Sequence, residues 1–108
     1  MVWSLDGWRN VWQTEPSLKQ WIVANCISTP LALYLPLSAA ETAIIIMGGI
    51  MVLAAECMNT AIERVVDDIG MDRRDLAKQA KDAGSAAVAV TAISVGAAWA
   101  TILCMNFL

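Results

Sequence analysis

The sequence contains no histidine, and its three cysteines stand far apart with no Cys-x-x-Cys pair among them. Zinc clusters need closely spaced cysteine or histidine ligands, and acid–base catalysis by imidazole needs a histidine. Both kinds of site are therefore excluded. Cys26, Cys57 and Cys104 fall in or beside apolar segments, which predicts that they are small packing residues. A GxxxxGK[ST] motif is also missing, which excludes a nucleotide site of the P-loop type.

Charged side chains are scarce as well: they make up 16% of the 108 residues, whereas 58% of the residues are hydrophobic. One soluble core of this size could not bury so much apolar surface, so we predict a single-domain membrane protein, 1–108. A spanning helix needs roughly 20 mostly apolar residues. Three segments have that length, 21–40, 42–62 and 84–108. Pro30 and Pro36 interrupt the first span, which is expected to kink or to end near Pro36.

The first part of the chain does not have the apolar run of a cleaved signal peptide. Apolar residues recur there at helical spacing, and three of them are Trp3, Trp8 and Trp12. Because tryptophan suits a membrane interface, segment 4–14 is predicted to be an amphipathic surface helix with Ser4 as its N-cap. A helix that packs on the protein through its tryptophans is the alternative. The predicted fold class is therefore an all-α membrane protein with three spans and a surface helix.

All seven basic residues lie on one side of this topology. Two precede the first span and five stand between the second and third spans, namely Arg9 and Lys19, then Arg64, Arg73, Arg74, Lys78 and Lys81. The positive-inside rule therefore places the N-terminus and the loop 63–83 in the cytoplasm, and the C-terminus on the periplasmic side of the inner membrane. The net charge of −3, without a strongly basic surface, argues against a nucleic-acid partner.

Acidic residues occur at the end of the second span, in ECMNTAIERVVDD (56–68). At about 100° per residue, four polar side chains of this stretch share one helix face within an arc of roughly 80°. They are Glu56, Asn59, Glu63 and Asp67. Glu56 is expected inside the hydrocarbon near its cytoplasmic boundary, where a carboxylate is costly and usually functional, and a general base is the expected role. A structural carboxylate in a helix cap or an interhelical hydrogen bond is the alternative.

Glu63 is expected at the water side of the same face. Together with Asp67 or another acid it would offer the oxygen ligands that Mg²⁺ binds alongside waters and phosphates, although a solvated helix face is the plainer interpretation. The segment IGMDRRDLAKQAKDAGSAAVAV follows. Gly70 is expected to stop the helix, and Asp72 to cap a short helix that ends near Lys78.

Lys81 and Asp82 stand directly before a run of small residues, Gly84, Ser85, Ala86 and Ala87. A lysine at a membrane boundary can hold a phosphate as a point charge, or it can snorkel to the headgroups. The small residues, like those at 48–49, favour close helix contact. Because three thin helices enclose a polar face poorly, a homo-oligomer with sites between subunits is expected.

The stretch ECMNTAIERVVDD resembles the signature of the prokaryotic diacylglycerol kinases, E-x-[apolar]-N-[ST]-A-[apolar]-E-x-x-V-D, and AKDAGSAAV resembles a second block of that family. The likeness extends from about Trp3 to Phe107. It implies a homotrimeric helical bundle in the cytoplasmic membrane that acts in phospholipid metabolism. It also implies transfer of the ATP γ-phosphate to diacylglycerol, giving phosphatidic acid, with Mg²⁺ as cofactor. The family includes undecaprenol kinases, so a polyprenol is the alternative acceptor.

The resemblance also implies roles for individual residues. Glu56 would be the catalytic base, and Glu15 and Glu63 would hold the metal of Mg-ATP. Further nucleotide contacts are implied for Asn59, Asp72, Arg73, Arg74, Lys81 and Asp82. The lipid substrate would be lined by Arg9, Trp12, Glu56, Ser85 and Trp99. Asp6, Trp21 and the stretch 72–74 depart from the family's usual residue types, so nucleotide contacts are expected to differ in detail.

Two other classes of protein are open from the residues alone. A small proton-coupled transporter would carry its acid near mid-membrane and usually has four spans, whereas Glu56 is expected nearer the cytoplasmic edge. A non-catalytic membrane subunit would need neither the polar face at 56–67 nor the pair Lys81–Asp82.

Overall fold

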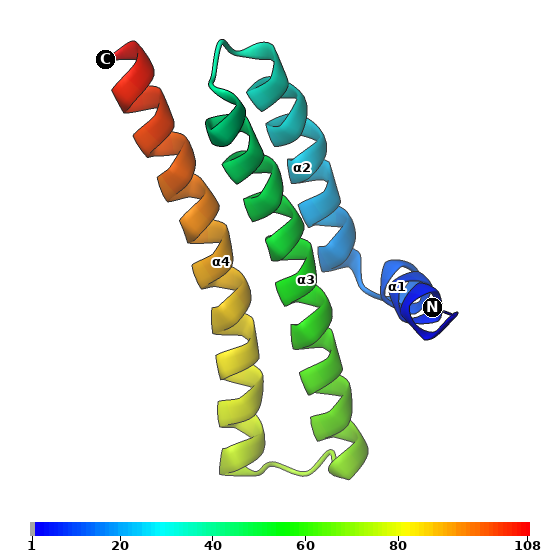
Figure 1. Cartoon of the computed structure of the whole chain (residues 1–108). Helices are drawn as coiled ribbons and strands as arrows, with labels where there is room; N and C mark the ends of the chain where they lie inside the picture. Colours follow the sequence, from blue (N-terminus) through cyan, green and yellow to red (C-terminus); the bar gives the residue numbers. More distant parts are fainter. Residues whose placement is uncertain (1) are drawn as a thin grey trace.

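The computed structural model describes residues 2–108, and this part of the chain contains four α-helices. They are α1 (Val2–Thr14), α2 (Pro16–Tyr34), α3 (Ala39–Ile69) and α4 (Asp75–Phe107). Figure 1 shows α2, α3 and α4 side by side with α3 in the middle, and α1, seen nearly end-on, beside the start of α2. The predicted all-α fold is confirmed.

The break between α1 and α2 falls at Glu15 and Pro16. The backbone N–H of Glu15 donates to Val11 O at 2.9 Å and closes α1. Proline then starts α2, because its fixed φ suits the first turn and its missing N–H would have no helical partner there. Ser4 lies inside α1, which begins at Val2, so the N-cap predicted at Ser4 is wrong.

Two tryptophans of α1, Trp8 and Trp12, are partly exposed. Trp8 is 43% and Trp12 is 41% exposed, and Val11 is the one buried residue among the described side chains of this helix. The side chain of Trp3 is outside the described part. This exposure agrees with an interfacial helix better than with a helix packed on the protein through its tryptophans.

The bounds of α2 differ from the predicted span 21–40. The helix starts at Pro16 and ends at Tyr34, close to the expected end at Pro36, with Pro30 inside it. Ser38 then starts α3 with a capping box: Glu41 N–H donates to Ser38 Oγ at 3.1 Å, and Ser38 N–H donates to Glu41 Oε1 at 2.8 Å.

Two helices, α3 and α4, are long and apolar enough to cross a membrane. Only 22% and 11% of their most apolar stretches are buried within the chain, so they are unlike the core helices of a soluble domain. The shorter α2, which carries Lys19, Gln20 and Asn25, is not among the candidate spans of the described residues. Length and composition thus support two of the three predicted spans.

The predicted loop 63–83 is mostly helical. Helix α3 continues to Ile69 and stops at Gly70, as predicted, and only residues 70–74 connect it to α4. The short helix expected before Lys78 is the first turn of α4, which runs on through the small residues without a break. No proline occurs in this stretch to stop it.

The cap that was expected at Asp72 is wrong. The N-cap residue of α4 is Arg74, and no side chain caps that helix end.

Glycines let α2 and α4 approach α3 closely. A Cβ at Gly49 would lie 1.9 Å from Asn25 Oδ1, and a Cβ at Gly48 would lie 2.9 Å from Val95 Cγ2. Asn25 Nδ2 donates to Gly49 O at 3.1 Å. The expected close helix contact at 48–49 is therefore confirmed within one chain.

The cysteines contribute less to packing than predicted. Cys26 and Cys104 are exposed and Cys57 is half-buried, and all three are free thiols. The first two face out of the bundle and do not fill its interior.

Candidate functional site

The polar face predicted on α3 is confirmed, and it is turned toward the neighbouring helices. Glu56 and Asn59 are buried, and Glu63 and Asp67 are half-buried. Glu56 contacts α2 through Ser17, which lies in the first turn of that helix. From Glu56 to its end at Ile69, α3 therefore extends about 20 Å past the start of α2, and Figure 1 shows the end of α3 and the start of α4 projecting beyond α1.

Glu56 is 5% exposed although it is a carboxylate. Ser17 Oγ donates to Glu56 Oε1 at 2.7 Å, and Thr60 Oγ1 donates to the backbone oxygen of Glu56 at 3.0 Å. Of these two bonds only that from Ser17 reaches the carboxylate, and a buried carboxylate needs such a donor because an unpartnered charge in a low-dielectric interior is costly. The interhelical hydrogen bond considered as the structural alternative is thus present, and it holds the carboxylate in one orientation.

Asn59 lies one turn further along α3 and is 8% exposed. Its Nδ2 donates to Glu63 Oε1 at 3.2 Å, while its Oδ1 is buried without a hydrogen-bond partner. If the amide of Asn59 were flipped, its Oδ1 would face Glu63 Oε1, and two hydrogen-bond acceptors would repel each other. The carboxylate of Glu63 therefore fixes the orientation of Asn59. We call Ser17, Glu56, Asn59 and Thr60 the buried polar cluster.

Glu15 is held against α3 by Arg64, a residue that the sequence analysis did not single out. Arg64 Nη2 lies 3.4 Å from Glu15 Oε1, and the same guanidinium donates to Asn10 Oδ1 and Thr14 Oγ1 in α1. Arg64 directly follows Glu63, so Glu15 contacts the helical turn of α3 that carries Glu63. Among the described residues no group of three or more His, Cys, Asp or Glu side chains could hold a metal, so protein ligands alone do not complete a metal site.

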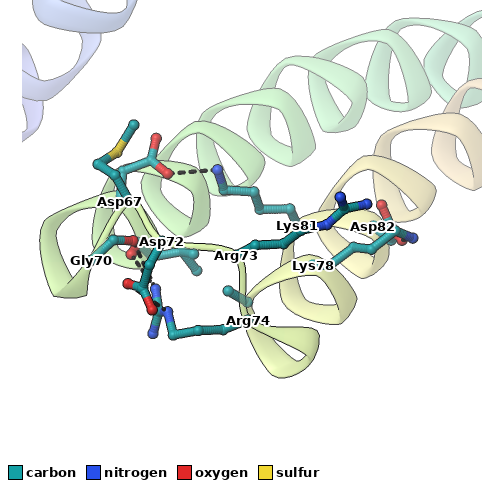
Figure 2. Close-up of a pocket in the computed structure, with 11 residues that line it drawn as sticks. Asp67, Gly70, Asp72, Arg73, Arg74, Lys78, Lys81 and Asp82 are labelled. Carbon is teal, nitrogen blue, oxygen red and sulfur yellow. Dashed lines mark hydrogen bonds and ion pairs between the residues drawn. The ribbon is translucent and has the colours of Figure 1, made fainter.

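A charged pocket lies between the end of α3 and the start of α4, with a volume of about 320 Å³ (Figure 2). It brings together five of the residues for which nucleotide contacts were implied: Asp72, Arg73, Arg74, Lys81 and Asp82. The remaining lining residues are Val66, Asp67, Gly70, Met71, Ala77 and Lys78. The short connection 70–74 closes one end of the pocket, because it joins the two helices that form its walls.

Ion pairs cross this charged pocket. Lys81 Nζ lies 2.5 Å from Asp67 Oδ1 and so links α4 to α3, and Lys78 Nζ lies 2.7 Å from Asp82 Oδ2 within α4. Lys78 and Asp82 are well exposed, whereas Lys81 and Asp67 are half-buried, and a bound anion can still compete with Asp67 for Lys81.

Arg74 has a structural position in the same pocket. Its Nη2 donates to Gly70 O at 2.8 Å and to Val66 O at 3.2 Å, and its Nε lies 3.5 Å from Asp72 Oδ1. These carbonyls end α3, where a cation is favourable because of the helix dipole. Arg74 therefore caps α3, whereas Arg73 is exposed.

The residues implied for the lipid side do not meet within one chain. Arg9 and Trp12 are exposed on α1, Ser85 is exposed on α4, and Trp99 Nε1 donates to Ser28 Oγ at 2.8 Å. Ser85 and Trp99 are separated by about 21 Å along α4.

A mostly apolar groove of about 790 Å³ lies between α1 and α3. Its lining includes Trp8, Val11, Cys57, Ala61 and Val65, but neither Arg9 nor Trp12. This groove could not be predicted from the sequence, because the direction in which α1 crosses α3 is not encoded in the pattern of either helix.

The comparisons with known proteins agree with one another. The family model of prokaryotic diacylglycerol kinase matches residues 2–103. A diacylglycerol kinase of Pseudomonas aeruginosa is 40% identical over 103 residues, which cover 94% of this chain and 82% of the relative. Diacylglycerol kinases of Haemophilus influenzae and Escherichia coli K12 are 36% and 34% identical, and the matches cover 94% and 97% of this chain and 86% of each relative.

Proposed function

The chain belongs to the prokaryotic diacylglycerol kinase family, and from this membership we propose that it phosphorylates diacylglycerol at the cytoplasmic membrane. The hydroxyl oxygen of diacylglycerol forms a bond to the γ-phosphorus of ATP, the bond from that phosphorus to the bridging oxygen breaks, and phosphatidic acid and ADP are released. The observation that carries the proposal is the buried carboxylate of Glu56, which lies at the head of a polar face leading to a charged pocket.

This polar face suits a reaction between an oily and a soluble substrate. Glu56 lies beside the start of α2, and Asp67 lies about 16 Å further along α3 at the edge of the charged pocket. The hydroxyl of a membrane lipid can reach the first position, and ATP can enter the second from water. The triphosphate would lie along the face between them.

Glu56 would act as the general base. Ser17 holds Glu56 Oε1 at 2.7 Å, which leaves the carboxylate oriented to accept the proton of the acceptor hydroxyl. The attacking oxygen gains electron density as that proton leaves. Little covalent catalysis is needed beyond this, since phosphoryl transfer depends chiefly on alignment and on neutralising charge.

Glu15 and Glu63 would hold Mg²⁺. Two carboxylates, completed by waters and phosphate oxygens, are a donor set that this ion accepts. Their positions favour the assignment, because Arg64 fixes Glu15 to α3 and Asn59 fixes one oxygen of Glu63 at 3.2 Å. When bound, the ion neutralises charge on the β- and γ-phosphates.

The residues of the charged pocket would have different roles in nucleotide binding. Lys81 and Arg73 would contact phosphates, with Asp82 beside them, whereas Arg74 and Asp72 would act mainly by shaping the connection 70–74. This division follows from the hydrogen bonds that already occupy Arg74.

We further propose a homotrimer in the inner membrane, with α2 as the third span of each subunit. Large apolar side chains are exposed on both α3 and α4, among them Ile50, Met51 and Ile93. Lipid or neighbouring subunits must cover these faces. A partner subunit would also bring together the separated residues Arg9, Trp12, Ser85 and Trp99 on the lipid side. The basic residues favour a cytoplasmic N-terminus and a periplasmic C-terminus.

The test is a phosphoryl-transfer assay with the purified chain in mixed micelles. Radiolabelled ATP is supplied with diacylglycerol or with undecaprenol, each with and without Mg²⁺. We expect labelled phosphatidic acid only with Mg²⁺, and much less product from undecaprenol. Labelling of undecaprenol alone would change the acceptor, and no labelling of either lipid would overturn the proposal.

A further inference from the structure

Gly84 lies where α4 crosses Asn59 of α3, and it is buried. A Cβ at this position would stand 2.5 Å from Asn59 Oδ1 and 3.4 Å from Ile62 Cδ1. The first distance is too short for any real side chain. No described glycine has a positive φ, so the backbone conformation does not require glycine here. Glycine is required here because the side chain of Asn59 occupies the space that a Cβ would fill.

A second glycine of α4 provides the contrast. A Cβ at Gly96 would meet nothing within 4 Å. Glycine weakens a helix interior relative to alanine in the same way at both positions. Gly84 is buried and Gly96 is exposed, and of these two glycines only Gly84 makes room for a polar side chain of the neighbouring helix.

The atom that would be displaced is the end of a flexible side chain. A methyl group at position 84 would be accommodated by rotation of the Asn59 amide, with little disturbance of either helix. That rotation moves Nδ2 as well as Oδ1, because the amide is planar. The 3.2 Å hydrogen bond from Nδ2 to Glu63 Oε1 would be lost or weakened.

We propose that Gly84 is a positioning residue for the kinase reaction. Because Gly84 has no side chain, the amide of Asn59 can keep the orientation in which it binds Glu63. Gly84 in α4 thereby influences the affinity of Glu63 in α3 for Mg-ATP. The inference rests on the proposed function for the role of Glu63, while the geometry of the amide stands without it.

The test compares Gly84→Ala with Gly96→Ala, two equal changes on the same helix. The Mg²⁺ concentration for half-maximal activity should rise roughly tenfold in Gly84→Ala, as expected for a lost hydrogen bond to a charged group. The KM for diacylglycerol should not change. Gly96→Ala should leave both values as in the unaltered protein.

A second measurement is independent of activity. The side-chain amide of Asn59 gives an NMR signal in detergent micelles, identified by its loss in Asn59→Ala. That signal should shift in Gly84→Ala and stay in place in Gly96→Ala. If the two glycine variants agree in both the amide signal and the Mg²⁺ requirement, the proposal is overturned.

The double variant Asn59→Ala/Gly84→Ala covers the case in which Gly84→Ala does not fold. Folding of the double variant would show that Asn59 is the side chain for which Gly84 makes room, and failure to fold would overturn the proposal. If the unaltered protein phosphorylates no diacylglycerol, the proposed function fails, and the amide signal still decides whether Gly84 orients Asn59.

Discussion

The two ends of the polar face on α3 are built in opposite ways. The buried polar cluster at one end holds a carboxylate with short, neutral side chains, as in the bond from Ser17 to Glu56. The charged pocket at the other end relies on ion pairs that are partly or well exposed, such as Lys81–Asp67 and Lys78–Asp82. Burial removes water as a competitor, so few contacts suffice at the first end, whereas exposed ion pairs contribute little stability. The first end is therefore suited to chemistry and the second to reversible binding.

The largest effect should come from replacing the carboxylate of the buried polar cluster. Glu56→Gln should lower turnover by about 10² to 10⁴-fold, the usual contribution of a general base. The fold should persist, because the glutamine oxygen can still accept the hydrogen bond of Ser17. The assay with diacylglycerol measures the loss, and thermal unfolding in detergent measures the fold.

Glu41→Gln is the matched control, because Glu41 lies on the same helix at its far end and caps it. It should retain activity. If Glu56→Gln keeps normal turnover, Glu56 is not the base.

The next effect concerns the donor that orients this carboxylate. Ser17→Ala should lower the free energy of unfolding by about 1–3 kcal/mol, because a buried acceptor loses its partner. Turnover should fall as well, but less than in Glu56→Gln. Ser17→Thr keeps the hydroxyl and should retain most of both properties. Equal stability of Ser17→Ala and the unaltered protein would show that water replaces the hydroxyl.

In the charged pocket the expected effect is on binding. Lys81→Met should raise the KM for Mg-ATP roughly tenfold, the effect of losing one charge-assisted contact to phosphate. Stability should change little, since its pair with Asp67 is partly exposed and such ion pairs contribute little. Lys78→Met serves as the control, because it removes an equal charge from a pair within α4. An equal rise in KM for both variants would mean that only net charge matters.

The smallest effect separates the two arginines of the pocket. Arg74→Ala should lower the free energy of unfolding by about 1 kcal/mol for each lost bond to the end of α3. Arg73→Ala should leave stability unchanged and weaken nucleotide binding instead. Thermal unfolding and nucleotide titration of both variants test this, and a stability loss confined to Arg73→Ala would reverse the assignment.

Helix periodicity explains why the polar face could be predicted from the sequence. Residues three and four apart share a side of any helix, so the directions of Glu56, Asn59 and Glu63 followed from their spacing alone. Periodicity does not say which helix that side will meet. The partners Ser17 and Gly84 come from distant parts of the chain, and only the packing of α2 and α4 on α3 identified them.

The loop 63–83 and the contacts of Arg74 and Arg64 were predicted less well, because local residue types do not reveal contacts between distant segments. Charged residues and Gly70 suggested a long loop at 63–83, yet only 70–74 is not helical. The bonds from Arg74 to the end of α3 depend on the path of that connection and leave no pattern in the sequence. Arg64 was missed for a similar reason, since its acceptors Asn10 and Thr14 lie in another helix.

The brevity of the connection 70–74 bears on how the catalytic work would be divided among subunits. Both walls of the charged pocket belong to consecutive helices of one polypeptide, tethered so tightly that they cannot part at that end. Under the proposed function and trimer, a single protomer separated by harsh detergent would keep the charged pocket and lose what a neighbouring subunit adds on the lipid side. Such a monomer would bind nucleotide but would not phosphorylate lipid.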